Sequence, residues 1–269
     1  MFFYFRTSNL KMVNKKFSIL TSAYNSGLYL NEWAKSIIKQ DYRPIEVVFV
    51  NDKSKDNTIK LIPEFEKKFK ENNIEFVFIN NKKRYFCGSG YNVALEKATG
   101  SYFGVLDSDD MLESYACSFV VNLYEKYPEV TWLYTQYNKY NKYMNRIIKK
   151  GFCKNPSKNK TILDNEKSGT NIFSHWRTFS DKLLQKDTIF KKKLKCCVDK
   201  YMGYRMEELG IGMFANKICY RYRTRTKSSR PISFHEQLSR VRWQLILEAK
   251  RRRKKEKIKC FSILKCKKK

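Results

Sequence analysis

The stretch GSGYNVALEKATGSYFGVLDSDD, residues 88–110, places a helix pattern, a strand pattern and an acidic cluster in direct succession. Residues 89–100 have helical spacing and end at Gly100, a residue typical of helix C-termini. The apolar run 101–107 then predicts a buried strand. Three carboxylates stand at its end: Asp107, Asp109 and Asp110. Like charges this close repel, so the cluster needs a cation, a set of donors or solvent.

Three apolar segments upstream predict further strands, at 16–25, 45–58 and 74–80. Helix patterns alternate with them, at 27–40 and from about Thr58. Apolar strands alternating with helices predict an α/β fold whose mostly parallel sheet is covered by helices on both faces. Open α/β sheets bind ligands at the carboxyl ends of their strands. The position of the acidic cluster therefore favours a binding site over a decorative surface loop.

The pattern weakens after residue 128. The expected elements are a strand at 130–137, a neighbouring strand at 145–151, a polar loop at 154–171, a helix that begins the segment 205–218, an exposed strand at 219–225 and a helix at 233–257. Two glycines interrupt the segment 205–218 and weaken its helix pattern.

At 269 residues and 42% hydrophobic, the chain can bury a substantial core and predicts one domain with appendages. We place the domain at 12–228, with halves at about 16–112 and 113–228, and a basic helical extension at 229–269. The patterned sequence begins just after Met12, so Met1 and Met12 are alternative starts.

The chain is strongly basic, because 56 Lys and Arg against 26 Asp and Glu give a net charge of +30. This excess favours anionic partners such as nucleic acid, acidic lipid or a phosphorylated ligand, although an AT-rich genome also enriches Lys, Asn and Tyr. The eight cysteines show no metal-binding spacing, which predicts reduced thiols in a cytoplasmic protein. No apolar run approaches the roughly 20 residues of a membrane span, and residues 1–5 lack the basic lead of a signal peptide.

Four segments in order resemble the family 2 glycosyltransferases, which have the GT-A fold: FSILTSAYN (17–25), IEVVFVNDKSKDNT (45–58), residues 88–110, and CYRYRTRTKSSRPIS (219–233). The resemblance covers roughly residues 16–234 and is strong to about residue 112. It implies a GT-A domain that transfers a sugar from a nucleotide-sugar, with UDP as the expected nucleotide, to a hydroxyl of a glycan or glycolipid. The family's transfer inverts the anomeric carbon and uses Mn²⁺ or Mg²⁺.

The resemblance assigns roles within the acidic cluster. Asp109 would hold Mn²⁺ or Mg²⁺ on the diphosphate, because hard cations prefer carboxylate and phosphate oxygens. Asp107 would point towards the ribose or the water shell of the metal. Asp110 would assist either role, or would cap a helix expected at 111–127.

Further donor-site residues follow from the same resemblance. Asp52, after the second strand, would accept a hydrogen bond from the uracil base, with a turn-closing role as the alternative. Ser22 and Tyr24 lie in the first loop, where the family contacts and stacks on the base; a tyrosine packed beneath the loop is the alternative. Arg84 would bind the diphosphate, with two neighbouring lysines as rivals and a solvated basic loop as the alternative.

An inverting transfer needs a carboxylate that takes the proton of the acceptor hydroxyl. Glu208 in YRMEELG resembles the family's catalytic acid, although the family has Asp at that position. Glu207 and Asp199 are competitors, and an acidic helix turn favoured by the helix dipole is the alternative. His175 is a candidate for the acceptor pocket or a structural histidine.

Residues 248–269 combine dense cations with a small apolar insert. Such a tail can lie on an anionic membrane surface, at about 1 kcal/mol per cation, or remain a solvated end. The family often uses lipid-linked acceptors, which gives a tail of this kind a purpose. We expect a chain truncated after Glu248 to stay folded and to release from anionic vesicles.

Two other classes of function compete with this one. A nucleotidyltransferase on a related nucleotide-binding sheet predicts a glycine-rich loop near the first strand, but residues 21–27 contain one glycine. A non-catalytic basic nucleic-acid-binding module would use aromatic and basic residues such as those at 219–227. That module leaves the ordered strand and acid pattern unexplained, so we expect no nucleic-acid partner.

Overall fold

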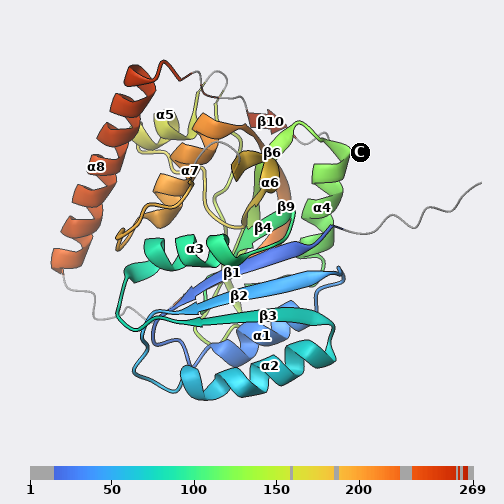
Figure 1. The fold of residues 1–269 in the computed structure, drawn as a ribbon. Helices are drawn as coiled ribbons and strands as arrows, with labels where there is room; N and C mark the ends of the chain where they lie inside the picture. The colour runs from blue at the N-terminus through green and yellow to red at the C-terminus, as the bar shows by residue number, and fades with distance from the viewer. Residues whose placement is uncertain are drawn as a thin grey trace, which may run out of the picture.

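The computed structural model describes residues 15–157, 160–184, 188–224, 232–258, 260 and 263–265. One central sheet runs through the described part of the chain, with the strand order β10-β9-β6-β8-β4-β1-β2-β3 (Figure 1). Helices flank this mixed, mostly parallel sheet, so the predicted α/β class is confirmed.

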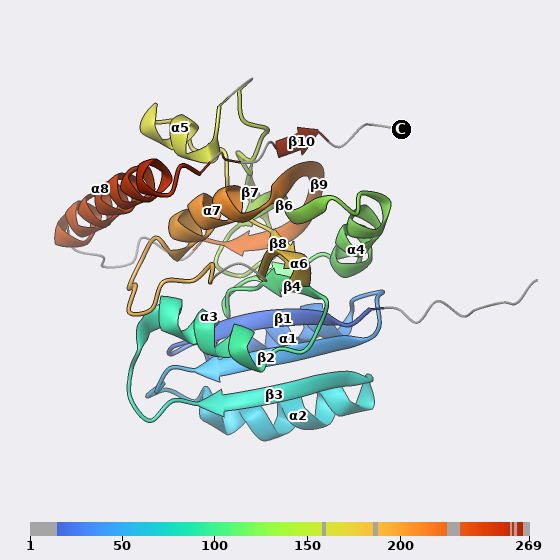
Figure 2. The same cartoon turned by 45° about the horizontal axis from the view of Figure 1, so that its top comes forward.

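The first half is a parallel α/β unit in the spatial order β4-β1-β2-β3. Its strands are β1 (Phe17–Ala23), β2 (Ile45–Asn51), β3 (Ile74–Asn80) and β4 (Tyr102–Val105). Its helices are α1 (Leu30–Ile38), η1 (Ile59–Leu61), α2 (Ile62–Glu71) and α3 (Phe86–Lys97). Figure 2 shows α3 on one face of these strands and α1 with α2 on the other. Every residue of β2 is buried, as expected for a strand covered on both faces.

Aromatic packing holds α1 and α2 against the sheet. Trp33 is fully buried, and its ring lies edge-on to Phe49 of β2 at 5.2 Å between centroids. It also meets Phe65 and Phe69 of α2 at 6.2 and 5.9 Å. Burying each of these side chains contributes about 1.5–3 kcal/mol, so this cluster stabilises the end of the sheet opposite the C-terminal half.

The second half extends the sheet with strands of both directions. Its strands are β5 (Met111–Leu112), β6 (Val130–Tyr140), β7 (Ile147–Lys150), β8 (Arg177–Ser180) and β9 (Ile211–Arg223), and its helices are α4 (Ala116–Lys126), α5 (Ile162–Lys167), α6 (Asp181–Leu184) and α7 (Val198–Leu209). Strand β8 is antiparallel to both β4 and β6, whereas β6 and β9 are parallel. The expected strand at 145–151 is confirmed as β7, which forms a hairpin with β6.

For this half, the expected loop at 154–171 was wrong, whereas the expected helical start of the segment 205–218 is confirmed. The polar segment 154–171 contains α5. Thr161 caps the N-terminus of this helix and forms a capping box with Asp164. The segment 205–218 is helical only to Leu209, and β9 starts at Ile211. A Cβ at Gly210 would lie 2.0 Å from the Thr131 hydroxyl, so the glycine lets the new strand run close beside β6.

The C-terminal segment is packed into the fold. Helix α8 (Ile232–Lys255) runs beside α7 and α5, and β10 (Ile263–Lys265) pairs in parallel with β9 (Figure 1). Leu245, Ile246 and Ala249 are buried on the inner face of α8. The expected helix at 233–257 is therefore present, but it serves as a layer of the domain. No helix in the described part of the chain combines the length and the apolar character needed to cross a membrane.

This packing reverses the expectation that a chain ending after Glu248 stays folded. The truncation removes Arg252 and Arg253, which form buried ion pairs with Glu207 and Glu208. Breaking a buried pair from one side typically costs about 3–5 kcal/mol. We expect a large loss of stability, measured by thermal and urea unfolding followed by circular dichroism.

The matched control is a chain ending after Ile258, which keeps both arginines and removes β10. We expect it to lose much less stability than the shorter chain. Equal unfolding midpoints for the chain ending after Glu248 and the full-length chain would show that the last turns of α8, with Arg252 and Arg253, are dispensable for stability.

Candidate active site

A cleft of about 340 Å³ opens at the carboxyl end of β4. Helix α3, strands β8 and β9 and the first turn of α7 also contribute to its wall. Its polar lining includes Tyr91, Asp107, His175, Arg177, Lys195, Asp199 and Tyr222. The cleft therefore lies where the sequence placed the acidic cluster, and it brings residues from both halves together.

Asp107 follows the end of β4 and is held by hydrogen bonds to residues of three elements, α3, β8 and β9. Its carboxylate accepts hydrogen bonds from the Tyr91 hydroxyl and, at 3.4 Å, from Arg177. Its backbone N–H donates to the Tyr220 hydroxyl at 3.2 Å. The side chain is still 32% exposed, so the carboxylate is fixed in direction and remains accessible to a ligand.

Asp110 is buried and anchors the acidic turn. Its carboxylate accepts from the Tyr220 hydroxyl at 2.8 Å and from the Arg223 backbone N–H at 2.7 Å, both on β9. Burial, followed by the negative charges of Asp109 and Asp107, raises the pKa of Asp110 well above its ordinary value. The expected helix at 111–127 starts only at Ala116, and Asp110 does not cap it.

Arg223 ties the acidic turn to two other segments. Its guanidinium donates to the backbone carbonyl of Asp109 at 2.6 Å and to that of Lys142 at 2.6 Å. It also donates to Glu32 of α1 at 2.7 Å. Because the fork of a guanidinium binds several oxygens in fixed directions, Arg223 fixes the turn between α1 and β9. The sequence pointed to this residue only as part of the segment 219–233.

His175, a doubtful candidate in the sequence, lies beside the carboxylates. Its ring stacks on Tyr220 at 4.4 Å and on Tyr222 at 5.2 Å. Its Nδ1 lies 3.1 Å from an Arg177 nitrogen. Burial and the charge of Arg177 hold the pKa of His175 well below its usual range, so the imidazole is neutral and Nδ1 accepts.

Three of these groups can hold a metal ion together. One ligand atom each from Asp107, Asp110 and His175 lies within 4.8 Å of the other two. Carboxylate oxygens and a neutral imidazole are suitable ligands for a divalent cation. Asp109, the metal ligand expected from the sequence, lies on the same turn, and this grouping does not include it.

Two expected donor-site residues, Tyr24 and Arg84, come together in space. The Arg84 guanidinium lies 3.7 Å from the centre of the Tyr24 ring, a cation–π distance. Ser22, at the end of β1, faces α3: a Cβ at Gly90 would lie 2.0 Å from the Ser22 hydroxyl. The three side chains thus flank the end of β1, and their roles towards a nucleotide stay predictions.

Asp52 is buried and binds the N-terminus of α3. Its carboxylate accepts from the backbone N–H groups of Tyr85 at 2.8 Å and Phe86 at 2.7 Å, and from the Asn81 amide at 3.0 Å. These bonds satisfy donors that a helix start leaves open, and the negative charge suits that end of the helix dipole. Both carboxylate oxygens of Asp52 therefore already accept hydrogen bonds within the chain. Recognition of uracil by Asp52 stays a prediction.

Glu208, the expected base, lies away from the cleft in an arginine network. Its side chain is fully buried, and it accepts from Arg205 at 2.7 Å, Arg252 at 2.6 Å and Arg253 at 3.0 Å. Burial alone would raise the pKa of Glu208, but Arg252 and Arg253 lower it below its ordinary value. A carboxylate enclosed in this way has no access to an acceptor hydroxyl, so its placement does not support the expected role.

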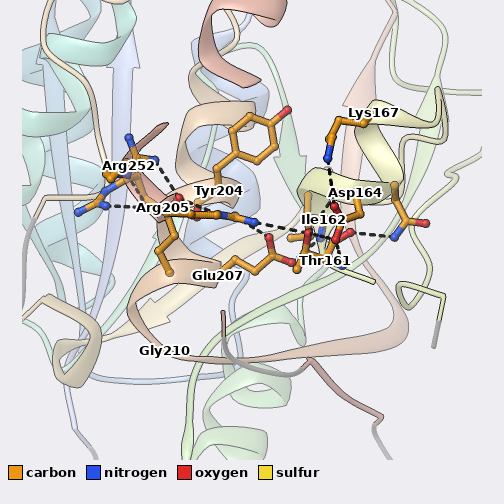
Figure 3. A network of polar contacts seen from close by, with 12 residues as sticks. Thr161, Ile162, Asp164, Lys167, Tyr204, Arg205, Glu207, Gly210 and Arg252 are labelled. Atoms are coloured by element: carbon orange, nitrogen blue, oxygen red, sulfur yellow. Dashed lines mark hydrogen bonds and ion pairs between the residues drawn. The ribbon is translucent and has the colours of Figure 1, made fainter. Parts of the chain in front are cut away.

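Glu207, the first competitor, belongs to the same network. It accepts from the Ile162 backbone N–H and from Arg253 at 3.0 Å. Burial raises the pKa of Glu207 to about 7, against the opposing charge of Arg253. Figure 3 shows Glu207 between the arginines and the first turn of α5, so this acid also serves the contact between α7, α8 and α5.

Asp199, the second competitor, lines the cleft from the first turn of α7. Asp199 and Glu208 are 208 − 199 = 9 residues apart on α7, about 2.5 turns at 3.6 residues per turn, so they point to opposite sides. Arg177 is buried between the acids of the cleft: burial would lower its pKa, but the charges of Asp107 and Asp199 raise it. Sequence reasoning missed Arg177, because a single arginine in SHWRTF gives no spacing signal.

Comparison with known proteins gives a consistent result. Residues 18–206 match the family model described as "Glycosyl transferase family 2". The chain is 29% identical over 204 residues to a chondroitin synthase of Escherichia coli and 31% identical over 204 residues to a hyaluronan synthase of Pasteurella multocida. Each match covers 76% of this chain but only 28% and 20% of the relatives, so the chain spans about a quarter of their length.

Solved structures share the fold. The structure of S. aureus TarS 1-349 in complex with UDP-GlcNAc has a TM-score of 0.66 at 23% identity, covering 86% of this chain and 66% of that one. The mannosyltransferase PcManGT from Pyrobaculum calidifontis, in complex with GDP-Man and Mn²⁺, has a TM-score of 0.59 at 15% identity, covering 89% and 65%.

A substitution at Glu208 tests whether this acid stabilises the fold or acts as the catalytic base. Glu208→Gln removes the charge that three arginines face, so we expect a loss of roughly 3–5 kcal/mol in the free energy of unfolding. The turnover of the remaining folded protein should be close to that of the unchanged chain. A fall in turnover of about 10²–10⁴-fold at unchanged stability would instead restore Glu208 as the base.

Proposed function

Since the chain belongs to glycosyl transferase family 2, we propose that it transfers a sugar from a UDP-sugar to a hydroxyl of a glycan or glycolipid with inversion of the anomeric carbon. The observation that carries this proposal is the shared cleft, in which the acidic turn after β4 faces Asp199 of α7. The fold shared with TarS 1-349 in its UDP-GlcNAc complex supports UDP as the nucleotide. Neither rival class of function finds support in the comparisons.

For the donor side, we keep Asp109 as the ligand of a Mn²⁺ or Mg²⁺ ion on the diphosphate, with Asp107 directed at the ribose or the water shell of the metal. The grouping of Asp107, Asp110 and His175 supports a cation at this turn. A bound cation would offset the repulsion among the carboxylates and the charge of the leaving diphosphate. Tyr24 and Ser22 would contact the base with Asp52, and Arg84 would bind a phosphate.

For the acceptor side, we propose Asp199 as the base in place of Glu208. A carboxylate on the wall of the cleft can reach a hydroxyl that enters beside the acidic turn. It would take the proton of that hydroxyl while the oxygen attacks the anomeric carbon from the side opposite the diphosphate. Arg177, buried between Asp107 and Asp199, would hold the two carboxylates in place through its positive charge.

We further propose that the outer face of α8 contacts an anionic membrane surface on the cytoplasmic side. Trp243 and Leu247 are exposed there, one helical turn apart. Exposed cations flank them: Arg240, Lys250, Arg251 and Lys254. An aromatic and an aliphatic side chain among cations suit the headgroup region of a bilayer. This face replaces the tail as the proposed contact, since Arg252 and Arg253 point inward.

Removal of the metal ligand tests the donor site. Asp109→Ala should abolish the Mn²⁺-enhanced binding of UDP while the fold stays intact, because the cation loses an oxygen ligand. Isothermal titration with UDP and GDP, with and without Mn²⁺, measures this, and Glu129→Ala removes an exposed carboxylate as the control. If UDP binding keeps its Mn²⁺ dependence in Asp109→Ala but loses it in Asp107→Asn, the metal ligands are instead the group of Asp107, Asp110 and His175.

Removal of the base tests the acceptor side. Asp199→Asn keeps the size of the side chain but cannot take up a proton as a carboxylate does. Turnover should fall by about 10²–10⁴-fold with little change in UDP binding. Glu96→Gln, an exposed acid-to-amide change on α3, is the control. Near-normal turnover in Asp199→Asn would show that Asp199 is not the base. A product with retained anomeric configuration would contradict the single-displacement mechanism.

A further inference from the structure

The hairpin of β6 and β7 is a cationic surface without acidic residues. Between Glu129 and Asp164 the sequence contains no Asp or Glu. The hairpin carries five cations: Lys139, Lys142, Arg146, Lys149 and Lys150. None of the five forms an ion pair with a carboxylate in the described part of the chain. Their charge is therefore available to an anionic partner.

The same hairpin exposes large apolar side chains. Tyr143 is 65% exposed, Ile147 and Ile148 are each 52% exposed, and Phe152 is 44% exposed. A solvated cationic hairpin needs none of these, and an exposed apolar group of this kind rimmed by polar residues marks a binding surface. The partner must therefore offer apolar surface as well as negative charge.

A row of aromatic rings connects this surface with the cleft. His175 on the cleft wall stacks on Tyr222 at 5.2 Å, and Tyr222 lies 6.1 Å from Tyr137. Tyr137 in turn lies 5.7 Å from Phe152 at the surface. The Lys139 ammonium sits 5.8 Å from the centre of the Tyr222 ring, so a cation accompanies the row near the cleft. Tyr137 and His175 are buried and join the two ends of the row. Phe152 is exposed and Tyr222 is partly exposed, so these two rings can present apolar area to the faces of sugar rings.

The hairpin is also rigidly connected to the acidic turn. Lys139 and Tyr140 of β6 pair in register with Tyr222 and Arg223 of β9. Arg223 then bonds the carbonyls of both Lys142, in the hairpin, and Asp109, in the acidic turn. A molecule on the hairpin therefore lies at a defined place relative to the reacting groups.

From these observations we propose that the β6–β7 hairpin binds the acceptor, and that the acceptor is an anionic glycan whose acidic groups are carboxylates or phosphates. Its sugar rings pass over Phe152 and Tyr222 into the cleft, and its acidic groups contact the lysines of the hairpin. The row of rings favours a glycan over a bilayer, since it continues the surface into a cleft that a bilayer cannot enter. The inference rests on the proposed function, whose acceptor it specifies.

The test compares glycans of equal length and different charge. The probes are an oligouronate, a glycerol phosphate oligomer and a neutral chitooligosaccharide, and binding is measured by isothermal titration at low and high salt. We expect both anionic probes to bind, the neutral probe to bind much more weakly, and high salt to weaken the anionic probes. The better of the two anionic probes identifies the acidic group.

Two variants locate the binding surface. Lys149→Gln with Lys150→Gln removes two exposed charges and should weaken anionic binding by about tenfold, whereas Lys67→Gln with Lys70→Gln on α2 is the matched control and should not. Phe152→Ala should weaken the same binding by removing the outermost ring. Thermal unfolding checks that each variant is folded.

Equal affinity for neutral and anionic glycans, or unchanged binding in the hairpin variants, would overturn the proposal. Hairpin-dependent binding of anionic vesicles or single-stranded DNA without binding of any glycan would do the same, and would assign the surface to that partner. Binding of UDP with Mn²⁺ distinguishes failure of the proposed function from failure of the hairpin proposal. If the unchanged chain does not bind UDP, the proposed function is contradicted. If it binds UDP but no glycan, only the proposal for the hairpin is contradicted.

Discussion

Mutual repulsion of the carboxylates after β4 is the constraint around which the two halves of this protein are arranged. Asp107, Asp109 and Asp110 lie within four residues, and burial of Asp110 sharpens the conflict. The chain offsets it with oriented donors: the hydroxyls of Tyr91 and Tyr220, and the guanidinium of Arg177. These hydrogen-bonding groups and the buried charge of Arg177 hold the carboxylates in fixed directions beside the cleft.

Most of these donors come from far along the chain. Tyr220 and Arg223 bond Asp110 from β9, 110 and 113 residues later in the sequence. The antiparallel strand β8 brings Arg177 and His175 to the same turn from the other side. The mixed strand directions of the second half therefore have a direct consequence: they bring the ends of β4, β8 and β9 to one cleft.

Helix α7 connects this cleft with the C-terminal segment. Its first turn carries Asp199, and its last turns carry Glu207 and Glu208 on the other side. The arginines of α8 hold those two acids in a buried network, so the direction of α7, and with it the position of Asp199, depends on α8. A basic C-terminal segment has thus acquired a structural role on its inner face, while its outer face keeps exposed cations.

The sequence by itself determined the first half. Continuous apolar strands with helices between them leave few other arrangements, and each strand end had to fall at one edge of a parallel sheet. The acidic turn and the α/β class follow from local patterns of this kind. Which of Glu208, Glu207 and Asp199 lines the cleft was decided only by the tertiary structure. All three are acids of one helix, and helical phase together with the arginines of a distant helix determines which one faces the cleft. The roles of Arg177 and Arg223 were equally hidden, because single residues acquire such roles through neighbours that are distant in sequence.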